Sequence, residues 1–190
     1  MRFPDDYNID REDLRTLYFI ILASLINIIE GVLPKVFPFL RLGVSNIVVI
    51  YALFALGSRK AFLISIFKTV FGSFVLGRLF TPMFLMGLCG SLLSVSVMIA
   101  LHRTGFFSVY GISAAGGTVH NTGQLIVLGT VYGIRYNGKL LGLALLLGLL
   151  TGIVNAFIFN KTYEHFSRRD REYPSDRDRI GKDICKNNLI

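Results

Sequence analysis

Acidic residues are almost absent from the middle of this sequence. Of the twelve Asp and Glu residues, five precede Leu14, six follow Tyr163, and Glu30 alone lies between them. Hydrophobic residues make up 53% of the 190-residue chain and charged residues 17%, whereas an ordinary soluble domain has about 25% charged residues. This distribution predicts a membrane protein whose central part is surrounded by lipid.

Six apolar segments in this central part are candidates for membrane-spanning helices, each of which needs about 20 mainly apolar residues. We expect helices at about residues 15–33, 44–58, 60–77, 82–101, 107–133 and 139–160. The predicted fold is therefore all-α, a polytopic membrane protein with a six-transmembrane-helix bundle in residues 15–160. Residues 1–14 are predicted to be a cytoplasmic N-terminal segment, and residues 161–190 a charged cytoplasmic tail that is disordered.

Positive charge predicts the orientation of the bundle, because short loops rich in Lys and Arg stay on the cytoplasmic side. With both termini inside, fourteen of the twenty Lys and Arg residues lie on the inner side, five lie on the outer side, and Lys68 lies within a span. We therefore expect a multi-pass protein of the cytoplasmic membrane, N-in and C-in. The alternating charges of the tail suit anionic lipid headgroups better than a nucleic acid, so no nucleic-acid partner is expected.

The connection between the first two predicted spans is too apolar to be a free aqueous loop. It contains Phe37, Phe39 and Leu40 together with two prolines. Irregular backbone at membrane depth persists only where it is buried in protein or lines a cavity. We therefore predict that residues 34–45 form an outer lid over the bundle, with Ser45 capping the second span.

Polar side chains within the spans are the candidate functional residues, since charged groups at the bilayer centre cost about 2.5 to 3.5 kcal/mol and normally face the bundle interior. Lys68 lies about halfway along the third span, and Glu30 lies near the outer end of the first. His120 and Gln124 are four residues apart and share a helix face. The predicted substrate-binding residues are Glu30, Arg41, Asn46, Lys68, His120, Asn121 and Gln124, with Asn27 as a weaker candidate.

A structural role is the alternative for this polar set. The amide and imidazole groups of the fifth span can hydrogen-bond other helices or backbone, as interhelical polar residues often do. Glu30 and Lys68 can form an internal ion pair. Both interpretations place these side chains inside the bundle.

Small residues predict where helices approach each other closely. In the sixth span they recur at every fourth position, at Ala144, Gly148, Gly152 and Ala156. Such a stripe lets helix backbones come together. In the fifth span Gly116 and Gly117, one turn before His120, leave room for a ligand or for a neighbouring helix.

No pattern typical of a catalytic or metal site is present. The spans contain one histidine with no acidic cluster beside it, whereas a metal site needs three or four convergent ligands. The segment GISAAGG lacks the Lys-Ser/Thr pair of a nucleotide-binding P-loop, and the sequence has no nucleophile elbow. We therefore expect no enzymatic activity, no metal and no cofactor.

Four blocks of the sequence resemble a known family. They are EGVLPKVFPFLRLGVSNI (30–47), FKTVFGSFVLG (67–77), FLMGLCGSLLSVSVM (84–98) and GISAAGGTVHNTGQL (111–125). In this order they are similar to the small membrane proteins called heptaprenyl diphosphate synthase component I or Gx transporter, which are related to the substrate-binding S components of energy-coupling factor (ECF) transporters. Lys68 stands where that family usually has an arginine, and lysine lacks the bidentate geometry of arginine.

The resemblance implies two functions of different classes. An S component captures a small molecule from outside and passes it inward with an ECF-type energising membrane subunit and cytosolic ATPases. For this chain the expected substrate is an anionic or zwitterionic vitamin-like molecule, such as a flavin or an isoprenoid or quinone precursor. The alternative is a non-catalytic membrane subunit of a soluble heptaprenyl diphosphate synthase, since the chain lacks the paired aspartate-rich motifs of the catalytic subunit. A membrane scaffold with neither role is the third option.

Overall fold

The computed structural model describes residues 11–33, 43–133, 135 and 137–172 of the chain. This part of the chain consists of helices and contains no strand. The helices are α1 (Arg11–Val32), α2 (Asn46–Ala55), α3 (Ser58–Val75), α4 (Pro82–Thr104), α5 (Val109–Thr130) and α6 (Gly138–Glu172). The prediction of an all-α fold is confirmed, and each predicted apolar segment corresponds to one helix.

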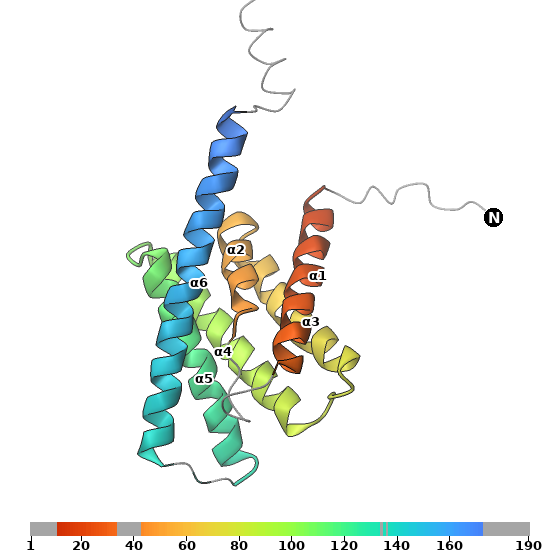
Figure 1. The fold of residues 1–190 in the computed structure, drawn as a ribbon, viewed down its shortest axis with the longest axis vertical. Helices are drawn as coiled ribbons and strands as arrows, with labels where there is room; N and C mark the ends of the chain where they lie inside the picture. Colours follow the sequence, from red (N-terminus) through yellow and green to blue (C-terminus); the bar gives the residue numbers. More distant parts are fainter. Residues whose placement is uncertain (1–10, 34–42, 134, 136, 173–190) are drawn as a thin grey trace, which may run out of the picture.

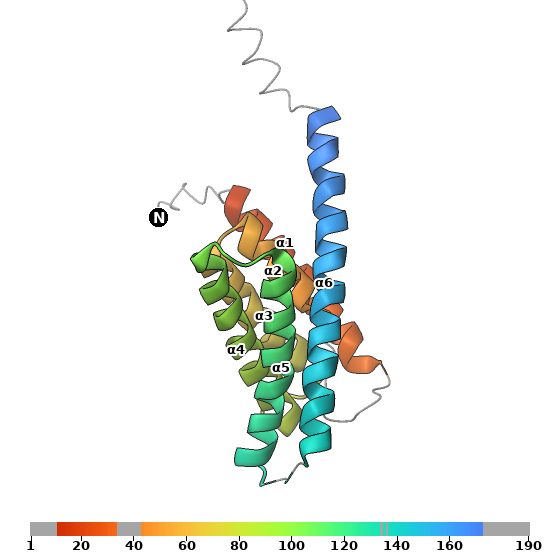
Figure 2. The same cartoon turned by 90° about the vertical axis from the view of Figure 1, so that its left-hand side faces the viewer.

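The helices pack side by side in alternating directions (Figure 1). Helix α5 packs against both α4 and α6, while α1 packs against α3. The turned view shows that α6 extends well beyond the other helices (Figure 2). Its 35 residues give a length of about 50 Å at 1.5 Å per residue. The helix therefore continues twelve residues past its predicted end at residue 160, into the segment that was expected to be a disordered tail.

Local chemistry accounts for the helix ends around the α4–α5 connection. Pro82 begins α4, where its missing N–H costs nothing, and the Thr81 hydroxyl accepts a hydrogen bond from the Phe84 N–H at 3.4 Å. The helix ends at Thr104 and is followed by Gly105, whose φ of 71° is left-handed and suits glycine. Ser108 then caps α5. These signals explain why the predicted boundaries of α4 and α5 lie within a few residues of the observed ones.

Helix α3 places polar residues inside and apolar residues outside. Phe67, Phe71 and Phe74 share one exposed face, while Lys68 and Thr69 are buried. In water such a helix would expose a large apolar surface and enclose its charge. In a lipid bilayer this arrangement is favourable instead. An apolar helix face can contact lipid, and an ionisable group is more stable in the bundle interior.

Three helices are long and apolar enough to cross a membrane. They are α1 over Glu12–Val32, α4 over Pro82–Thr104 and α6 over Gly138–Glu164. Helix α2 has ten residues and covers about 15 Å, and α3 carries three cationic residues, Arg59, Lys60 and Lys68. The fold therefore indicates a membrane protein with three candidate spans, whereas six crossings stay a prediction.

Short helix α2 is enclosed by the bundle and brings its first residues into the interior. Six of its ten residues are buried, including Asn46, Val49 and Leu53. It packs against α3 and also contacts α1, α4 and α6. The start of α2, which the sequence places between the predicted lid and a span, therefore lies among side chains from several other helices.

Close packing of α5 and α6 depends on the predicted stripe of small residues. A Cβ added at Gly148 would lie 2.5 Å from the carbonyl oxygen of Gly117, which is shorter than any ordinary contact. A Cβ at Gly152 would likewise collide with the backbone of Ser113. The hydroxyl of Ser113 donates to the Gly152 carbonyl at 2.7 Å, a bond that requires this approach.

Neighbouring helices fill the space beside Gly116 and Gly117. A Cβ at Gly116 would lie 2.7 Å from the Met98 side chain of α4, and one at Gly117 would meet the Gly148 backbone of α6. Of the two interpretations that the sequence left open, a neighbouring helix is therefore the one observed.

Candidate functional site

The predicted site residues that the structure describes are all buried. None of them is more than 8% exposed: they are Glu30, Asn46, Lys68, His120, Asn121 and Gln124. The predicted site residue Arg41 and the predicted lid residues Phe37, Phe39 and Leu40 lie outside the described residues.

Gly43, three residues before α2, lies beside polar side chains from four helices. Its N–H donates to the Glu30 carboxylate of α1 at 2.5 Å, and its carbonyl accepts from the Asn155 amide of α6 at 3.2 Å. A Cβ at this position would lie 3.2 Å from Asn46 Nδ2 and 3.5 Å from His120 Cδ2 of α5. The φ of 75° at Gly43 is left-handed, a conformation that glycine adopts without a steric penalty.

Lys68 reaches the start of α2 from the middle of α3. Its Nζ donates to Asn46 Oδ1 at 2.5 Å and to Ser45 Oγ at 3.1 Å, and the side chain is 1% exposed. The amide of Asn27 on α1 donates to the Lys68 carbonyl at 2.9 Å. The Ser45 and Asn46 oxygens offset part of the free-energy cost of burying the Lys68 ammonium group.

Ser45 does not cap α2 as the sequence predicted. It occupies the N-cap position but makes no side-chain capping bond. Its hydroxyl accepts a hydrogen bond from Lys68 instead. The predicted cap is wrong, and the backbone of Ser45 is helical (φ −60°, ψ −14°) rather than extended as in a capping residue.

These contacts define one group of side chains and backbone at the interior end of α2. Glu30 and Lys68 bind opposite ends of residues 43–46, so a carboxylate and an ammonium fasten the same short connection. We call this group the Lys68 cluster; its members are Asn27, Glu30, Gly43, Ser45, Asn46, Lys68, His120 and Asn155.

His120 and Gln124 share one face of α5, beside Gly90 of α4, whereas Asn121 points in another direction. Asn121 faces α6, and its amide donates to the Ala144 carbonyl at 3.1 Å. Gln124 lies against α4, where a Cβ at Gly90 would be 3.2 Å from Gln124 Cγ. His120 lies between Gly90 and Gly43. Of this predicted trio, His120 therefore joins the Lys68 cluster, whereas Asn121 and Gln124 contact neighbouring helices.

A family model for heptaprenyl diphosphate synthase component I matches residues 19–162. The chain belongs to the heptaprenyl diphosphate synthase component I family. This match confirms, for this family, the resemblance predicted from the sequence blocks. The matched region contains every member of the Lys68 cluster. No curated protein and no solved structure matches the chain significantly.

Two members of the cluster in this component I chain were not predicted from the sequence. Asn155 is an amide within the otherwise apolar stretch LLTGIVNAFIF, and that contrast could have marked it. Gly43 acts through its backbone N–H and carbonyl, which every residue except proline carries. Its role depends on the left-handed turn before α2, and no side-chain pattern shows such a turn.

The Lys68 cluster presents more hydrogen-bond donors than anionic acceptors. Its side chains include an ammonium, three amides and an imidazole but one carboxylate, that of Glu30. No three His, Cys, Asp or Glu side chains lie together in the described ranges of this component I chain, so a metal has no ready ligand set there. The chemistry of the cluster suits an anion, or a zwitterion whose cationic part meets Glu30.

Proposed function

We propose that this component I protein binds a small anionic or zwitterionic molecule at the Lys68 cluster. The observation that carries the proposal is the burial of the Lys68 ammonium at mid-helix, bonded to the same connection that Glu30 and Asn155 bind. Ionisable side chains inside membrane helices are rare and usually mark a functional site.

The arrangement of the cluster supports a binding role over a packing role. A polar side chain that only holds two helices together needs one partner on the neighbouring helix. Asn121 has such a partner in the Ala144 carbonyl of α6. In the cluster, side chains from α1, α3 and α6 all bind residues 43–46, which are an irregular connection and the first turn of α2. A ligand that takes over some of these bonds would release that connection, so binding and movement of the predicted lid, residues 34–45, would be coupled.

In its finer form the proposal is uptake of a vitamin-like molecule by an S-component-like protein. The bundle would cross the cytoplasmic membrane six times with both termini inside, and the ligand would enter from outside. An ECF-type energising membrane subunit with cytosolic ATPases would be the partner. A flavin or an isoprenoid or quinone precursor would present the anionic group that Lys68 and Asn46 can bind and the apolar body that the bundle interior can hold.

The family name favours a second function, a non-catalytic membrane subunit of a heptaprenyl diphosphate synthase. In that role a soluble synthase would bind the cytoplasmic side, where α6 projects beyond the bundle up to Glu172 (Figure 2). Deletion of residues 173–190, which leaves α6 intact, separates the two functions. Loss of synthase co-purification with unchanged ligand binding would favour the subunit role, and unchanged co-purification would count against a role for those residues.

Ligand-induced stabilisation of the purified protein tests the binding proposal. The panel contains flavins, quinone precursors and prenyl diphosphates, and the variants are Lys68→Met and, as a control, Lys139→Met at the exposed start of α6. A ligand at 100 times its Kd should stabilise the wild type by about 2.7 kcal/mol. The control should keep this shift and Lys68→Met should lose it. A shift of equal size in Lys68→Met would contradict the proposal.

A further inference from the structure

A hollow of about 410 Å³ lies between the start of α3 and the end of α4. It is lined by Ser58, Arg59, Phe62, Leu63, Ile99 and Arg103. Its volume falls in the range of about 300 to 1,000 Å³ that is typical of small-molecule sites. Arg59 precedes Lys68 by nine residues, or about 13 Å along the helix. The hollow is therefore separate from the Lys68 cluster.

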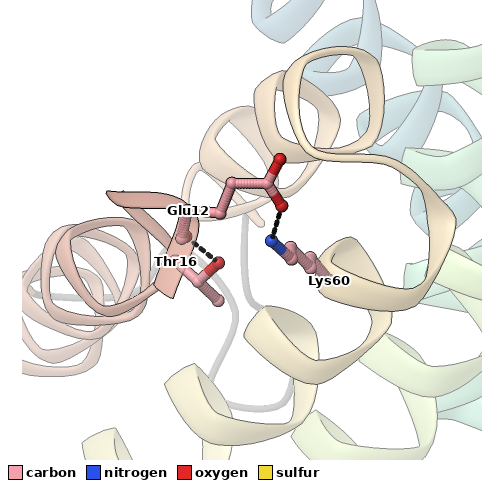
Figure 3. Close-up of polar contacts among 3 residues, drawn as sticks. All are labelled: Glu12, Thr16 and Lys60. Atoms are coloured by element: carbon pink, nitrogen blue, oxygen red, sulfur yellow. Dashed lines mark hydrogen bonds and ion pairs between the residues drawn. The ribbon is translucent and has the colours of Figure 1, made fainter. Parts of the chain in front are cut away.

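The two arginines of the hollow carry uncompensated positive charge. In the part of the chain that the structure describes, the guanidinium groups of Arg59 and Arg103 have no carboxylate or hydrogen-bond partner. The next residue along α3 behaves differently, because Lys60 Nζ pairs with the Glu12 carboxylate of α1 at 2.6 Å (Figure 3). The Thr16 hydroxyl donates to the backbone carbonyl of the same Glu12, one turn earlier in α1. Glu12 thus neutralises Lys60 and leaves the arginines available to an external anion.

Backbone donors add to this positive potential. The N-terminus of α3 opens onto the hollow at Ser58, and the preceding residue, Gly57, offers no side-chain cap. The first N–H groups of an uncapped helix, together with the helix dipole, favour an anion. The remaining wall, formed by Phe62, Leu63 and Ile99, is apolar.

Exposed aromatic residues place the hollow near a membrane interface. Phe106 is 91% exposed and Phe107 is 50% exposed, and both lie in the α4–α5 connection a few residues after Arg103. Helix α4 is a candidate span that ends at Thr104. Aromatic side chains and arginines at the end of a span are typical of the level where headgroups meet acyl chains.

We infer that the hollow binds an anionic phospholipid of the surrounding bilayer. The guanidinium groups of Arg59 and Arg103 donate to the phosphate oxygens, for which the planar fork of arginine is well suited. Phe62, Leu63 and Ile99 contact the first part of the acyl chains. Basic pockets between membrane helices on the cytoplasmic side bind phospholipid headgroups in this manner. The inference does not depend on a ligand at the Lys68 cluster.

Native mass spectrometry of the full-length protein with phosphatidylglycerol or phosphatidylcholine tests this inference. The wild type should retain phosphatidylglycerol in preference to phosphatidylcholine. The double variant Arg59→Gln/Arg103→Gln should bind phosphatidylglycerol at least about tenfold more weakly, because charge-assisted bonds to the phosphate are lost. Lys60→Gln, which removes a neighbouring charge that Glu12 already neutralises, should bind like the wild type.

Three results would overturn the inference. The first is unchanged phosphatidylglycerol binding by the double variant. The second is an equal loss in Lys60→Gln, which would indicate nonspecific surface attraction. The third is displacement of the lipid by an equimolar prenyl diphosphate, which would make that molecule the occupant. A single thermal transition at the wild-type temperature shows that each variant is folded. Ligand-induced stabilisation that depends on Lys68 reports separately on the Lys68 cluster.

Discussion

At the scale of single residues, the connection before α2 is held by the Lys68 ammonium and by hydrogen bonds to the backbone of Gly43. Lys68 was expected to face the interior because a cation at mid-span has no other favourable place. Its partners, Ser45 and Asn46, could not be assigned, since they depend on where α2 begins within the bundle. Gly43 acts through its backbone, and Asn121 turns toward α6 because it is one residue, or about 100°, beyond His120.

Gly43→Ala should destabilise the protein more than the same substitution at another glycine with a left-handed backbone. Gly133→Ala is the matched control, because Gly133 also has a positive φ but no atom lies within 4 Å of an added Cβ. The control should lose about 1 to 2 kcal/mol for the backbone alone. Gly43→Ala should lose more, since the new Cβ also presses on Asn46 and His120. Chemical unfolding in detergent measures both losses, and equal values would show that these contacts contribute nothing.

At the scale of helices, the fold was more predictable than the site. Six apolar segments gave six helices because length, hydropathy and terminal signals such as Pro82 and Gly105 are local properties. The repeat at Gly148 and Gly152 predicted the close contact with α5, since only small residues permit it. The convergence of α1, α3, α5 and α6 on residues 43–46 is a tertiary property, and no local pattern predicts it.

Gly148→Ala should therefore destabilise the protein, whereas Gly142→Ala on the same helix should not. An added Cβ at Gly148 meets the α5 backbone, and one at Gly142 meets no atom within 4 Å. Replacing an exposed helical glycine by alanine favours the helix by about 0.5 to 1 kcal/mol, while overpacking costs about 1 to 3 kcal/mol. Unfolding midpoints in the same detergent should therefore move in opposite directions. A rise for both variants would contradict the close approach of α5 and α6.

At the scale of the whole molecule, the central question is how many helices cross the membrane. Three are long and apolar enough by themselves. Of the other three, α2 is short, and α3 and α5 contain polar residues of the Lys68 cluster. A polar residue that faces the bundle interior lowers the hydropathy of its helix without exposing that residue to lipid. We therefore expect α3 and α5 to cross in company with α1, α4 and α6, and the short helix α2 to complete the six crossings of the proposed topology.

Cysteine labelling from the two sides of the membrane tests this topology. Single cysteines replace Arg103 at the end of α4 or Asn137 before α6, both exposed, in a chain whose Cys89 and Cys185 are changed to serine. An impermeant maleimide added to intact cells should label position 137, and position 103 should react after permeabilisation. Labelling of both positions from the same side would mean that α5 does not cross.

The proposed function depends on the Lys68 cluster being a ligand site. The most direct measurement is the identity of a small molecule that the protein retains through gentle purification. Wild-type and Lys68→Met proteins are purified in parallel, and the extracted molecules are compared by mass spectrometry. The wild type should carry an anionic or zwitterionic molecule that the folded variant lacks. Equal retention by both proteins, or a cluster that binds no molecule from the panel at any concentration, would contradict the proposed function.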